Sequence, residues 1–482
     1  MIAVVTFGAV VRFGFVYDDQ WTIVHNRALS GSLGPLLAAV ARGTAKSAGI
    51  PDSTRPSMIV SSFFDRHLFG LRPSLHHLHS LLLYGLAVAL AFLLARALVG
   101  RTRAAFVAAV VYAVCPLHAE VVAAINYRED LLQAIGVMAA LYALLRLRPR
   151  ASSAIEATWV SIAFGAALFA KESAAVLVVL APTLAWLTRR DLVAWLRARE
   201  RALFGLAATL VLWANWRLAL LHGGDDVPRA SYATLSLRLF ATARYVVRAT
   251  SASLFPFSWS PERAREPAAS WMWMVPLLAI VVAVIVLARR RASRPFAIGG
   301  ALAVLSPLGS SPLVGPYNAF TDRYLFLATL GGALVWGVLV DRLADRIPRR
   351  ARVFVLIAAI VPVAAVAMQA SSAWRDDRAL WTCATERAPD SPRAWAGLSR
   401  VHRLAGELDD ADRTVARAIA LDPTYLPARL TQAYAQLARG DVEAARATLE
   451  ALRWAGGDTL LGYKKAAECA RRADAARCVS SM

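Results

Sequence analysis

Charged residues are scarce over long parts of this sequence. Only 18% of the chain is charged and 58% is hydrophobic, and five stretches are almost free of charge: 75–98, 174–187, 271–288, 324–340 and 353–370. Each is close to the roughly 20 residues that an α-helix needs to cross the hydrocarbon core of a bilayer. Ordinary soluble domains are nearer half apolar. The scarcity of charge therefore indicates a polytopic membrane protein.

Cysteine is also scarce, since the chain has only four. This number does not make the dense disulfide framework of a small secreted domain. Cys469 and Cys478 are close in sequence. On one continuous helix they would lie about 13 Å apart, too far to bridge, whereas a turn between them would permit a disulfide. Both alternatives stay open.

The sequence contains no recognisable cleavable signal peptide. Its first apolar stretch, residues 1–16, contains Arg12 and leads directly into Tyr17-Asp18-Asp19. We interpret this stretch as a membrane span. Arg12 then either extends toward the interface or marks a chain whose natural start lies upstream.

Acidic residues are outnumbered, with 33 Asp and Glu against 54 Lys and Arg, a net charge of +21. The C-terminal segment 371–482 holds 17 basic and 15 acidic residues, a balance of +2, so the remaining +19 lies in residues 1–370. There the excess occurs as short arginine clusters between apolar stretches. This pattern is typical of membrane topology and does not favour a nucleic-acid partner.

Eleven spans are predicted, and the connections between them alternate in charge. The spans are 1–16, 75–98, 103–118, 130–146, 155–170, 173–188, 202–221, 271–288, 296–310, 323–340 and 352–370. Five connections, within 101–103, 146–150, 189–201, 289–294 and 342–352, together hold 19 arginines. The positive-inside rule places them in the cytoplasm and the other connections, with everything after residue 370, outside.

This alternation requires that residues 235–257 do not cross the membrane. The segment carries Arg238, Arg244 and Arg248, which are costly in hydrocarbon. We interpret it as an amphipathic helix at the outer interface. The alternative, a twelfth span, would place the C-terminal segment in the cytoplasm.

The composition changes after Gln369, and a helical repeat follows. Its key positions are Trp395, Leu398, Gly406, Ala411, Val415, Ala418 and Pro423. Gly440 and Ala445 lie 34 positions after Gly406 and Ala411, the period of tetratricopeptide (TPR) repeats. We expect the small residues to allow close helix packing and Pro423 to end the second helix. Segments 374–390 and 458–478 are expected to be partial flanking helices.

The fold class is therefore all-α, with a polytopic membrane domain over 1–370 and a TPR α-solenoid over 371–482. Repeat arrays of this kind bind peptides or protein surfaces, so a protein partner is expected.

Ionisable residues gather at the outer ends of the predicted spans. These are Asp18 and Asp19; Arg55; His118, Glu120, Arg128, Glu129 and Asp130; Lys171 and Glu172; and Asp322 and Arg323, followed by Tyr324. Each group alone has a structural interpretation, as a helix cap, a snorkelling arginine or a charged turn. Ionisable groups in or beside spans nevertheless mark functional sites by default. Five such groups on one face predict a shared polar site.

Metal binding is not assigned. His76 and His79 share a helix face without an evident carboxylate partner, and we predict no metal site there. The Asp18-Asp19 pair is compatible with a divalent cation or with none.

The sequence resembles a known family in the order of its polar segments. These are FVYDDQWTIVHN, RPSMIVSSFFDRHLFGLRPSLHHLHSLLLYG, CPLHAEVVAAINYREDLL, FAKESAAVL and DRYLFLATLGG, followed by the repeat. The order is similar to that of the transmembrane O-mannosyltransferases with TPR repeats that target cadherins, and of their bacterial relatives. These enzymes are members of the GT-C superfamily of glycosyltransferases.

The resemblance implies a GT-C-like membrane domain that moves a sugar, mannose in the family, from a polyprenyl phosphate to a protein Ser/Thr or glycan hydroxyl on the outer face. It implies that Asp18 or Asp19 is catalytic, without choosing between them. It also implies a donor-phosphate or cavity role for Arg55, His118, Glu120, Arg128, Asp130, Lys171, Glu172, Asp322, Arg323 and Tyr324. Cationic side chains would stabilise the phosphate leaving group.

The Ala- and Arg-rich composition is typical of a bacterium with a high-GC genome. We therefore expect a multi-pass protein of the cell inner membrane with a periplasmic TPR domain. Two other functions compete with the transferase. A non-catalytic scaffold would recruit a periplasmic partner through the repeats and would have scattered charges. A transporter would need duplicated halves, and none is evident.

Overall fold

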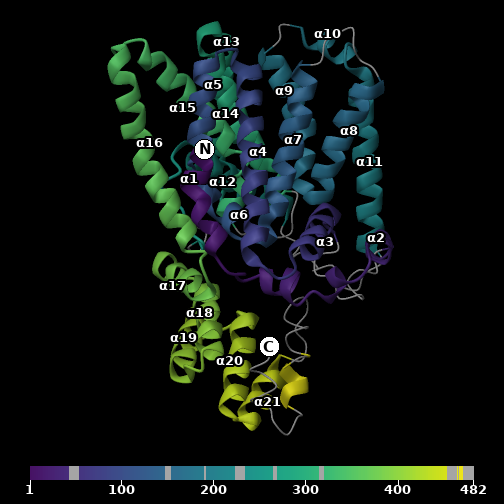
Figure 1. The fold of residues 1–482 in the computed structure, drawn as a ribbon, viewed down its shortest axis with the longest axis vertical. Coiled ribbons are helices and arrows are strands. Elements are labelled where there is room, and N and C mark those ends of the chain that lie inside the picture. The colour runs from purple at the N-terminus through teal and green to yellow at the C-terminus, as the bar shows by residue number, and fades with distance from the viewer. Residues whose placement is uncertain are drawn as a thin grey trace. The chain divides into compact units, whose positions relative to one another are not determined.

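The computed structural model describes residues 1–42, 54–146, 154–188, 191–222, 234–263, 269–313, 320–452, 464 and 466–470. Every regular element in these ranges is helical (Figure 1), so the all-α class is confirmed for the described residues. Several predicted features lie outside them: Arg148, Arg150, Arg189, Arg190, Cys478 and most of the flanking segment 458–478.

The chain divides into two compact units. Unit 1 comprises Met1–Gly223, Ala233–Trp259 and Ala268–Arg375, and unit 2 comprises Gly224–Tyr232, Ser260–Pro267 and Asp376–Met482. The main boundary between the units lies after Arg375, and the last long helix of unit 1 ends at Ser372.

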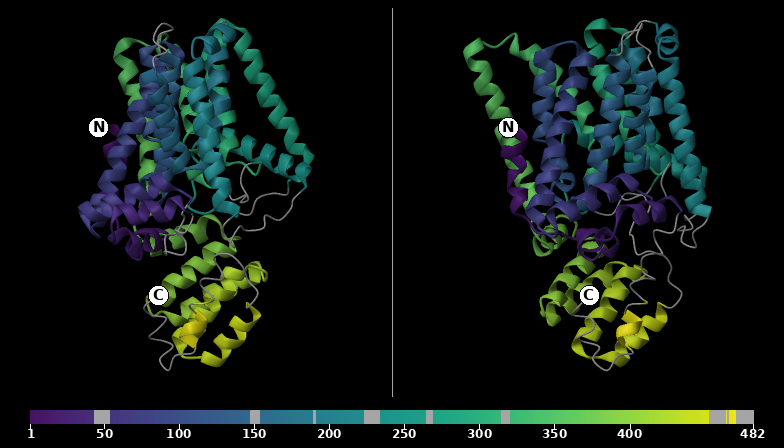
Figure 2. Two further views of the ribbon diagram at one scale, coloured as in Figure 1. Left: turned by 90° about the vertical axis from the view of Figure 1, so that its right-hand side faces the viewer. Right: turned by 45° about the vertical axis from the view of Figure 1, so that its right-hand side comes forward.

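Unit 1 is a bundle of long helices with shorter ones at its ends (Figure 2). The helices are α1 (Ile2–Phe7), α2 (Leu33–Ala41), α3 (Pro56–Phe69), α4 (Pro73–Val99), α5 (Thr102–Ala113), α6 (Ala119–Ala123), α7 (Arg128–Arg146), α8 (Ala154–Ala170), α9 (Leu177–Thr188), α10 (Leu192–Arg197), α11 (Glu200–His222), α12 (Leu235–Leu254), α13 (Met274–Arg289), α14 (Arg294–Leu305), α15 (Thr329–Ala344) and α16 (Arg349–Ser372). Short 3₁₀ or π turns lie at Gly8–Arg12, Gln20–Val24, Arg27–Ser30, Pro116–His118, Ile125–Tyr127, Glu172–Val176, Trp271–Trp273, Arg291–Ser293, Ser306–Ser310 and Asp322–Leu325.

Four helices in the described ranges are long and apolar enough to cross a membrane: Pro73–Val99, Glu200–Leu220, Trp271–Arg289 and Arg350–Ser372. A fifth crossing results if the bent pair Thr102–Ala113 and Pro116–Ala123 is one span. These helices support a multi-pass membrane protein. Each of the eleven predicted spans overlaps at least one helical segment, but the number of spans stays a prediction because several of these helices are short or broken. Helix α12, which carries the three arginines noted above, is not among the candidate spans.

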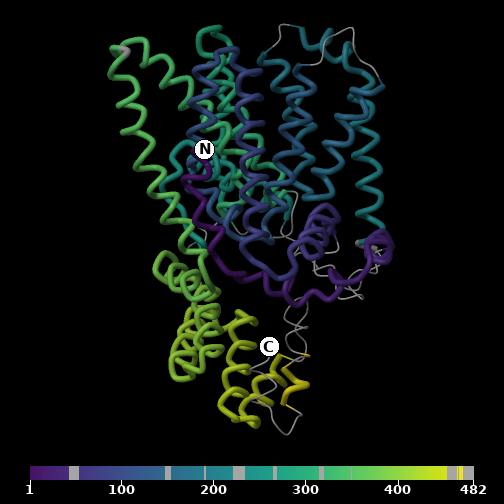
Figure 3. The backbone as a smooth tube through the Cα atoms, viewed as in Figure 1, coloured from purple at the N-terminus to yellow at the C-terminus, as the bar shows by residue number. Residues whose placement is uncertain are grey.

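The two ends of unit 1 differ in character. Helices α2 and α3 lie at one end and α10 at the other (Figure 1), and the chain leaves α1 to run along the first end toward α2 (Figure 3). At other helix ends, arginine-rich connections contact one another. Arg101 Nε lies 2.8 Å from Asp341 Oδ2, and Arg342 donates to the carbonyl of Ala292. These contacts join three of the five connections that the charge pattern places in the cytoplasm.

Close backbone approach holds the middle of the bundle together. A Cβ at Gly331 of α15 would lie 2.5 Å from the carbonyl oxygen of Gly299 of α14 and 2.4 Å from the amide nitrogen of Ala303. Only glycine fits this crossing, since any side chain would push the helices apart. In membrane helices such small-residue contacts supply the packing that the hydrophobic effect cannot.

Unit 2 consists of consecutive helices that pack against their neighbours in the chain. They are α17 (Asp377–Arg387), α18 (Pro392–Leu404), α19 (Leu408–Leu421), α20 (Leu426–Arg439) and α21 (Val442–Ala451). The predicted packing residues Leu398, Ala411, Ala418 and Ala445 are buried, and Trp395 packs beside Ala396. Pro423 follows the end of α19. Glu262, from the connection between α12 and α13, accepts hydrogen bonds from Ser391 and Arg393 within this unit.

The glycines of the 34-residue period serve a different purpose from the one we expected. Gly406 and Gly440 have φ angles of +77° and +83°, and a Cβ at either would meet nothing within 4 Å. They are therefore selected for the left-handed backbone that ends α18 and α20, and not for close helix contact. Ala411 and Ala445, which are fully buried, supply the close contact instead.

The cysteines differ in state. Cys469 is disulfide-bonded, whereas Cys115 and Cys383 are free thiols. Cys478, the fourth cysteine, lies outside the described residues.

Candidate active site

Asp19 ties the first loop to the segment before α7. Its Oδ1 accepts a hydrogen bond of 2.6 Å from the amide of Asn126, and its Oδ2 accepts from the amides of Val16 (3.2 Å) and Ile125 (3.4 Å). The side chain is fully buried. Burial raises the pKa of Asp19 to about 7, while the three amide donors oppose the rise. Both carboxylate oxygens of Asp19 are therefore engaged by backbone amides.

Asp18 is the more accessible of the two carboxylates. It is partly exposed, and its Oδ2 accepts a hydrogen bond of 3.1 Å from the hydroxyl of Tyr127. The preceding residue, Tyr17, has φ = +52° and is the only non-glycine residue with positive φ in the described part of the chain. A positive φ is energetically unfavourable for a residue with a side chain, and residues in this conformation are concentrated at functional sites. The backbone is thus strained where it presents Asp18.

A network of alternating charges lies beside these acids. Lys171 Nζ is 2.6 Å from Asp130 Oδ1 and 3.2 Å from Glu129 Oε1, and all three side chains are buried. Lys171 also lies 4.4 Å from the centre of the Tyr324 ring. The two carboxylates compensate the positive charge of Lys171, which would be costly to bury without a counter-charge.

Arg323 links this network to Asp18. Its Nη1 donates to Glu120 Oε1 at 2.7 Å, and its guanidinium carbon lies 3.8 Å from the centre of the Tyr127 ring. Arg323 Nε and Asp130 Oδ2 face each other at 3.9 Å, and neither atom has a hydrogen-bond partner among the described residues. The separation exceeds hydrogen-bonding distance and leaves two buried polar atoms open to a further polar group.

The network ends at a pair of arginines. Arg55, which precedes α3, donates to Glu129 and lies 3.9 Å from Glu172. Arg217 of α11 lies 3.6 Å from the other oxygen of Glu172. Glu172 thus brings together Arg55 and Arg217, which are 162 positions apart in the sequence.

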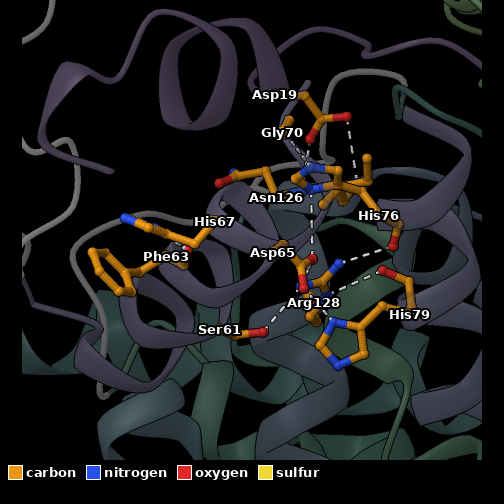
Figure 4. Close-up of polar contacts among 12 residues, drawn as sticks. Asp19, Ser61, Phe63, Asp65, His67, Gly70, His76, His79, Asn126 and Arg128 are labelled. Atoms are coloured by element: carbon orange, nitrogen blue, oxygen red, sulfur yellow. Dashed lines mark hydrogen bonds and ion pairs between the residues drawn. The ribbon is translucent and has the colours of Figure 1, made fainter. Parts of the chain in front are cut away.

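Arg128 belongs to a separate buried cluster (Figure 4). Its guanidinium donates to Asp65 Oδ2 at 2.6 Å, to the hydroxyls of Ser61 and Ser80, and to the carbonyl of His76. Asp65 also accepts from His79 Nδ1 at 2.6 Å. Because the protein satisfies Arg128 completely, its geometry favours a role in positioning α3, α4 and α7 over the predicted contact with a phosphate.

His118 lies apart from the ion network in an aromatic core. Its Nε2 lies 2.7 Å from the hydroxyl of Thr329 and its Nδ1 lies 2.9 Å from that of Tyr84. Its ring packs 4.4 Å from Phe326. A fully buried imidazole with both nitrogens occupied favours a structural role. Asp322 is buried next to Arg323 in sequence.

Both oxygens of Asp19 accept backbone hydrogen bonds, so of the acidic pair Asp18 is the carboxylate with the more accessible oxygens. His76 and His79 do have a carboxylate neighbour, Asp65, which already faces the cation of Arg128. The group with ligand-like spacing in the described residues is His402, Glu407 and Asp410 of unit 2, where Glu407 already binds Arg378 and His402.

Sequence reasoning missed three residues of this region: Asp65, Tyr127 and Arg217. Asp65 is the one carboxylate in α3, and Arg217 is a charge near one end of a span. Both signals were present in the sequence and mark sites by default. Tyr127 carries no such signal, because an isolated tyrosine beside a charged turn is common.

The comparisons with known proteins converge on one enzyme type. Residues 66–217 match the model of the dolichyl-phosphate-mannose-protein mannosyltransferase family. Protein O-mannosyl-transferase Tmtc1 of Drosophila melanogaster is 33% identical over 133 residues, which are 27% of this chain and 16% of the fly protein. Protein O-mannosyl-transferase TMTC1 of Mus musculus is 33% identical over 132 residues, 26% of this chain and 14% of the mouse protein. The matched stretches are a small part of both relatives. The matches support the resemblance to GT-C glycosyltransferases.

Proposed function

We propose that this chain, which resembles the GT-C mannosyltransferases, transfers a sugar from a polyprenyl-phosphate donor to a hydroxyl of a protein or glycan on the outer face of the membrane. The observation that supports this proposal most is the convergence of Asp18 with the buried network of Lys171 and Arg323. The alternative of a non-catalytic scaffold, in which the charged sites only satisfy one another, predicts scattered charges.

Asp18 is the proposed general base. It takes the proton of the acceptor hydroxyl while the acceptor oxygen bonds to the sugar's anomeric carbon. The bond from that carbon to the phosphate oxygen breaks, and the polyprenyl phosphate leaves with the electron pair. Attack opposite the leaving group inverts the anomeric configuration. The cations of the network stabilise the charge that develops on the phosphate.

Asp19 and Tyr127 are the proposed positioning residues. Asp19 fixes the loop through three backbone amides, and Tyr127 orients the Asp18 carboxylate by a hydrogen bond. In this proposal Asp18, rather than Asp19, is the catalytic carboxylate.

Replacing Asp18 with Asn tests the assignment. We expect transfer from a radiolabelled polyprenyl-phosphate mannose in membranes to fall by about 100-fold or more, with expression and thermal midpoint unchanged. Glu200→Gln, an exposed carboxylate at the start of α11, is the matched control. Full transfer by Asp18→Asn would refute the assignment of the base.

Unit 2 is the proposed TPR domain, facing the periplasm of a bacterial inner membrane and binding a protein partner. Its consecutive packed helices and the 34-residue period support this. The disulfide of Cys469 is consistent with an oxidising compartment. The alternative of a non-catalytic scaffold predicts that the wild-type chain transfers no sugar, so that Asp18→Asn and wild type do not differ in this assay.

A further inference from the structure

Arg217 is a cation in a helix that is otherwise apolar enough to cross the membrane. In the described part of the chain it donates no hydrogen bond. Its one ion pair, with Glu172, is 3.6 Å long, beyond ordinary hydrogen-bonding distance, and its guanidinium lies 5.7 Å from the Trp213 ring. A charged residue held so loosely within a span is not explained by folding alone.

The surroundings of Arg217 are built and fixed. Trp216, next to it on α11, packs 5.1 Å from Phe169 of α8, and α8 and α11 lie side by side (Figure 1). Trp216 also packs against a cluster of buried apolar residues between α1 and α4, formed by Leu29, by Leu36 and Val40 of α2, and by Ile59 and Phe63 of α3. The position of Arg217 relative to Arg55 and Glu172 is therefore set by packed side chains.

Arg55 and Arg217 are the accessible cations of the network. Their side chains are 22% and 23% exposed, against 16% for Arg323, 3% for Lys171 and 0% for Arg128. Glu172 lies between them at 3.9 Å and 3.6 Å, and its Oε2 accepts no hydrogen bond from the described residues. Glu172 thus faces two guanidinium groups beyond hydrogen-bonding distance, and Arg55 is in addition hydrogen-bonded to Glu129.

We propose that Arg217 and Arg55 form the binding site for the phosphate ester of a polyprenyl lipid, with Glu172 as an internal anion that occupies the pair when the lipid is absent. Two guanidinium groups provide the donors that phosphate oxygens bind most strongly. A site at the end of a membrane helix receives a headgroup whose chain stays in the bilayer. This inference rests on the proposed function and adds Arg217 to its donor site.

Competition between Glu172 and the phosphate predicts opposite changes in phosphate affinity for substitutions of Glu172 and of Arg217. Removing the charge of Glu172 removes the anion that faces both guanidinium groups, while Arg55 keeps its hydrogen bond to Glu129. Glu172→Gln should therefore bind phosphate more tightly, whereas Arg217→Gln should bind it more weakly. A purely structural ion pair would predict that both substitutions act in the same direction.

Binding of tritiated polyprenyl phosphate to the full chain in nanodiscs tests this directly. We expect Arg217→Gln to raise Kd by about 10-fold or more, Arg217→Lys to raise it less, and Glu172→Gln to lower it. Arg201→Gln, at the other end of α11, should leave it unchanged. Thermal midpoints establish that the variants fold. If Arg217→Gln does not fold, the comparison of Arg217→Lys with the wild type provides the test.

Competing probes identify the source of the phosphate. Polyprenol, inorganic phosphate and phosphatidylglycerol in the nanodisc should each displace the lipid poorly. Equal displacement by phosphatidylglycerol, unchanged Kd in the folded Arg217 variants, or weaker binding by Glu172→Gln would each overturn the proposal. If the wild-type chain binds polyprenyl phosphate but transfers no sugar, the transferase function is refuted while the proposed phosphate site is supported.

Discussion

At the scale of single residues, the two adjacent aspartates illustrate how burial separates chemically identical groups. Asp19 is buried and both of its carboxylate oxygens accept hydrogen bonds from backbone amides, whereas Asp18 is partly exposed and follows the strained Tyr17. The same contrast separates the arginines, since Arg128 is satisfied inside the protein and Arg217 is not. Residue type alone carries none of this information.

The pH dependence of stability should report Asp19. Burial raises the pKa of Asp19 to about 7 in the folded protein, from the 3.8 of an ordinary aspartate. The folded state binds this proton more tightly, so the contribution of Asp19 to stability is complete below about pH 4 and is lost as pH rises through about 7. We expect the wild-type thermal midpoint to fall more than that of Asp19→Asn between about pH 5 and pH 8 in scanning fluorimetry. Parallel curves would contradict a raised pKa.

The ion pair between Asp65 and Arg128 should be a large local contributor to stability. Asp65→Asn leaves the buried guanidinium without its counter-charge, which costs about 3–5 kcal/mol. We expect denaturant unfolding in detergent to show this loss, and a further Arg128→Leu substitution to recover part of it. A double-mutant cycle with no coupling would show that the pair is not stabilising.

At the scale of elements, glycine serves two physical purposes in this chain. In α14 and α15 it permits backbones to touch, and at the ends of α18 and α20 it permits a left-handed turn. A third case is Gly397 of α18, where a Cβ would meet the Trp381 ring of α17 at 2.2 Å.

Alanine substitutions separate these purposes within unit 2. We expect Gly406→Ala and Gly440→Ala each to cost roughly 1–2 kcal/mol from backbone strain. Gly397→Ala should cost more, because the Trp381 ring must move to admit the methyl group. Limited proteolysis of the full chain measures the opening of unit 2 in each variant. Equal protection of all three variants and wild type would contradict the assignments.

At the scale of the whole molecule, the proposed topology places the first loop and unit 2 on the same side of the membrane. Cys469 is disulfide-bonded and Cys383 is free, which gives unit 2 two internal reporters of its compartment.

Thiol labelling of intact cells and of denatured protein tests this topology. We expect a maleimide to label Cys469 in denatured protein only after reduction, and to label it without reduction when periplasmic thiol oxidation is removed. A cysteine introduced at Trp21 should react with an impermeant reagent from the same side as Cys383. Labelling of these two positions from opposite sides would refute the proposed topology.

The sequence by itself determined the elements that local physics controls. Apolar runs of membrane length predicted helices that the structure contains, and the five groups of charges at the ends of the predicted spans identified most members of the ion network. It also located the segment that matches known mannosyltransferases, although that match covers residues 66–217 and not Asp18 or Arg323.

Only the tertiary structure decided which charges meet. Asp18, Tyr127 and Arg323 are distant in sequence and are adjacent because three helix ends meet at one place. The periodicity of a helix records which face is apolar, but not which charged residue of another helix it meets. The separation of Asp18 from Asp19, the enclosure of Arg128 and the loose hold on Arg217 all follow from long-range packing, which no local pattern encodes.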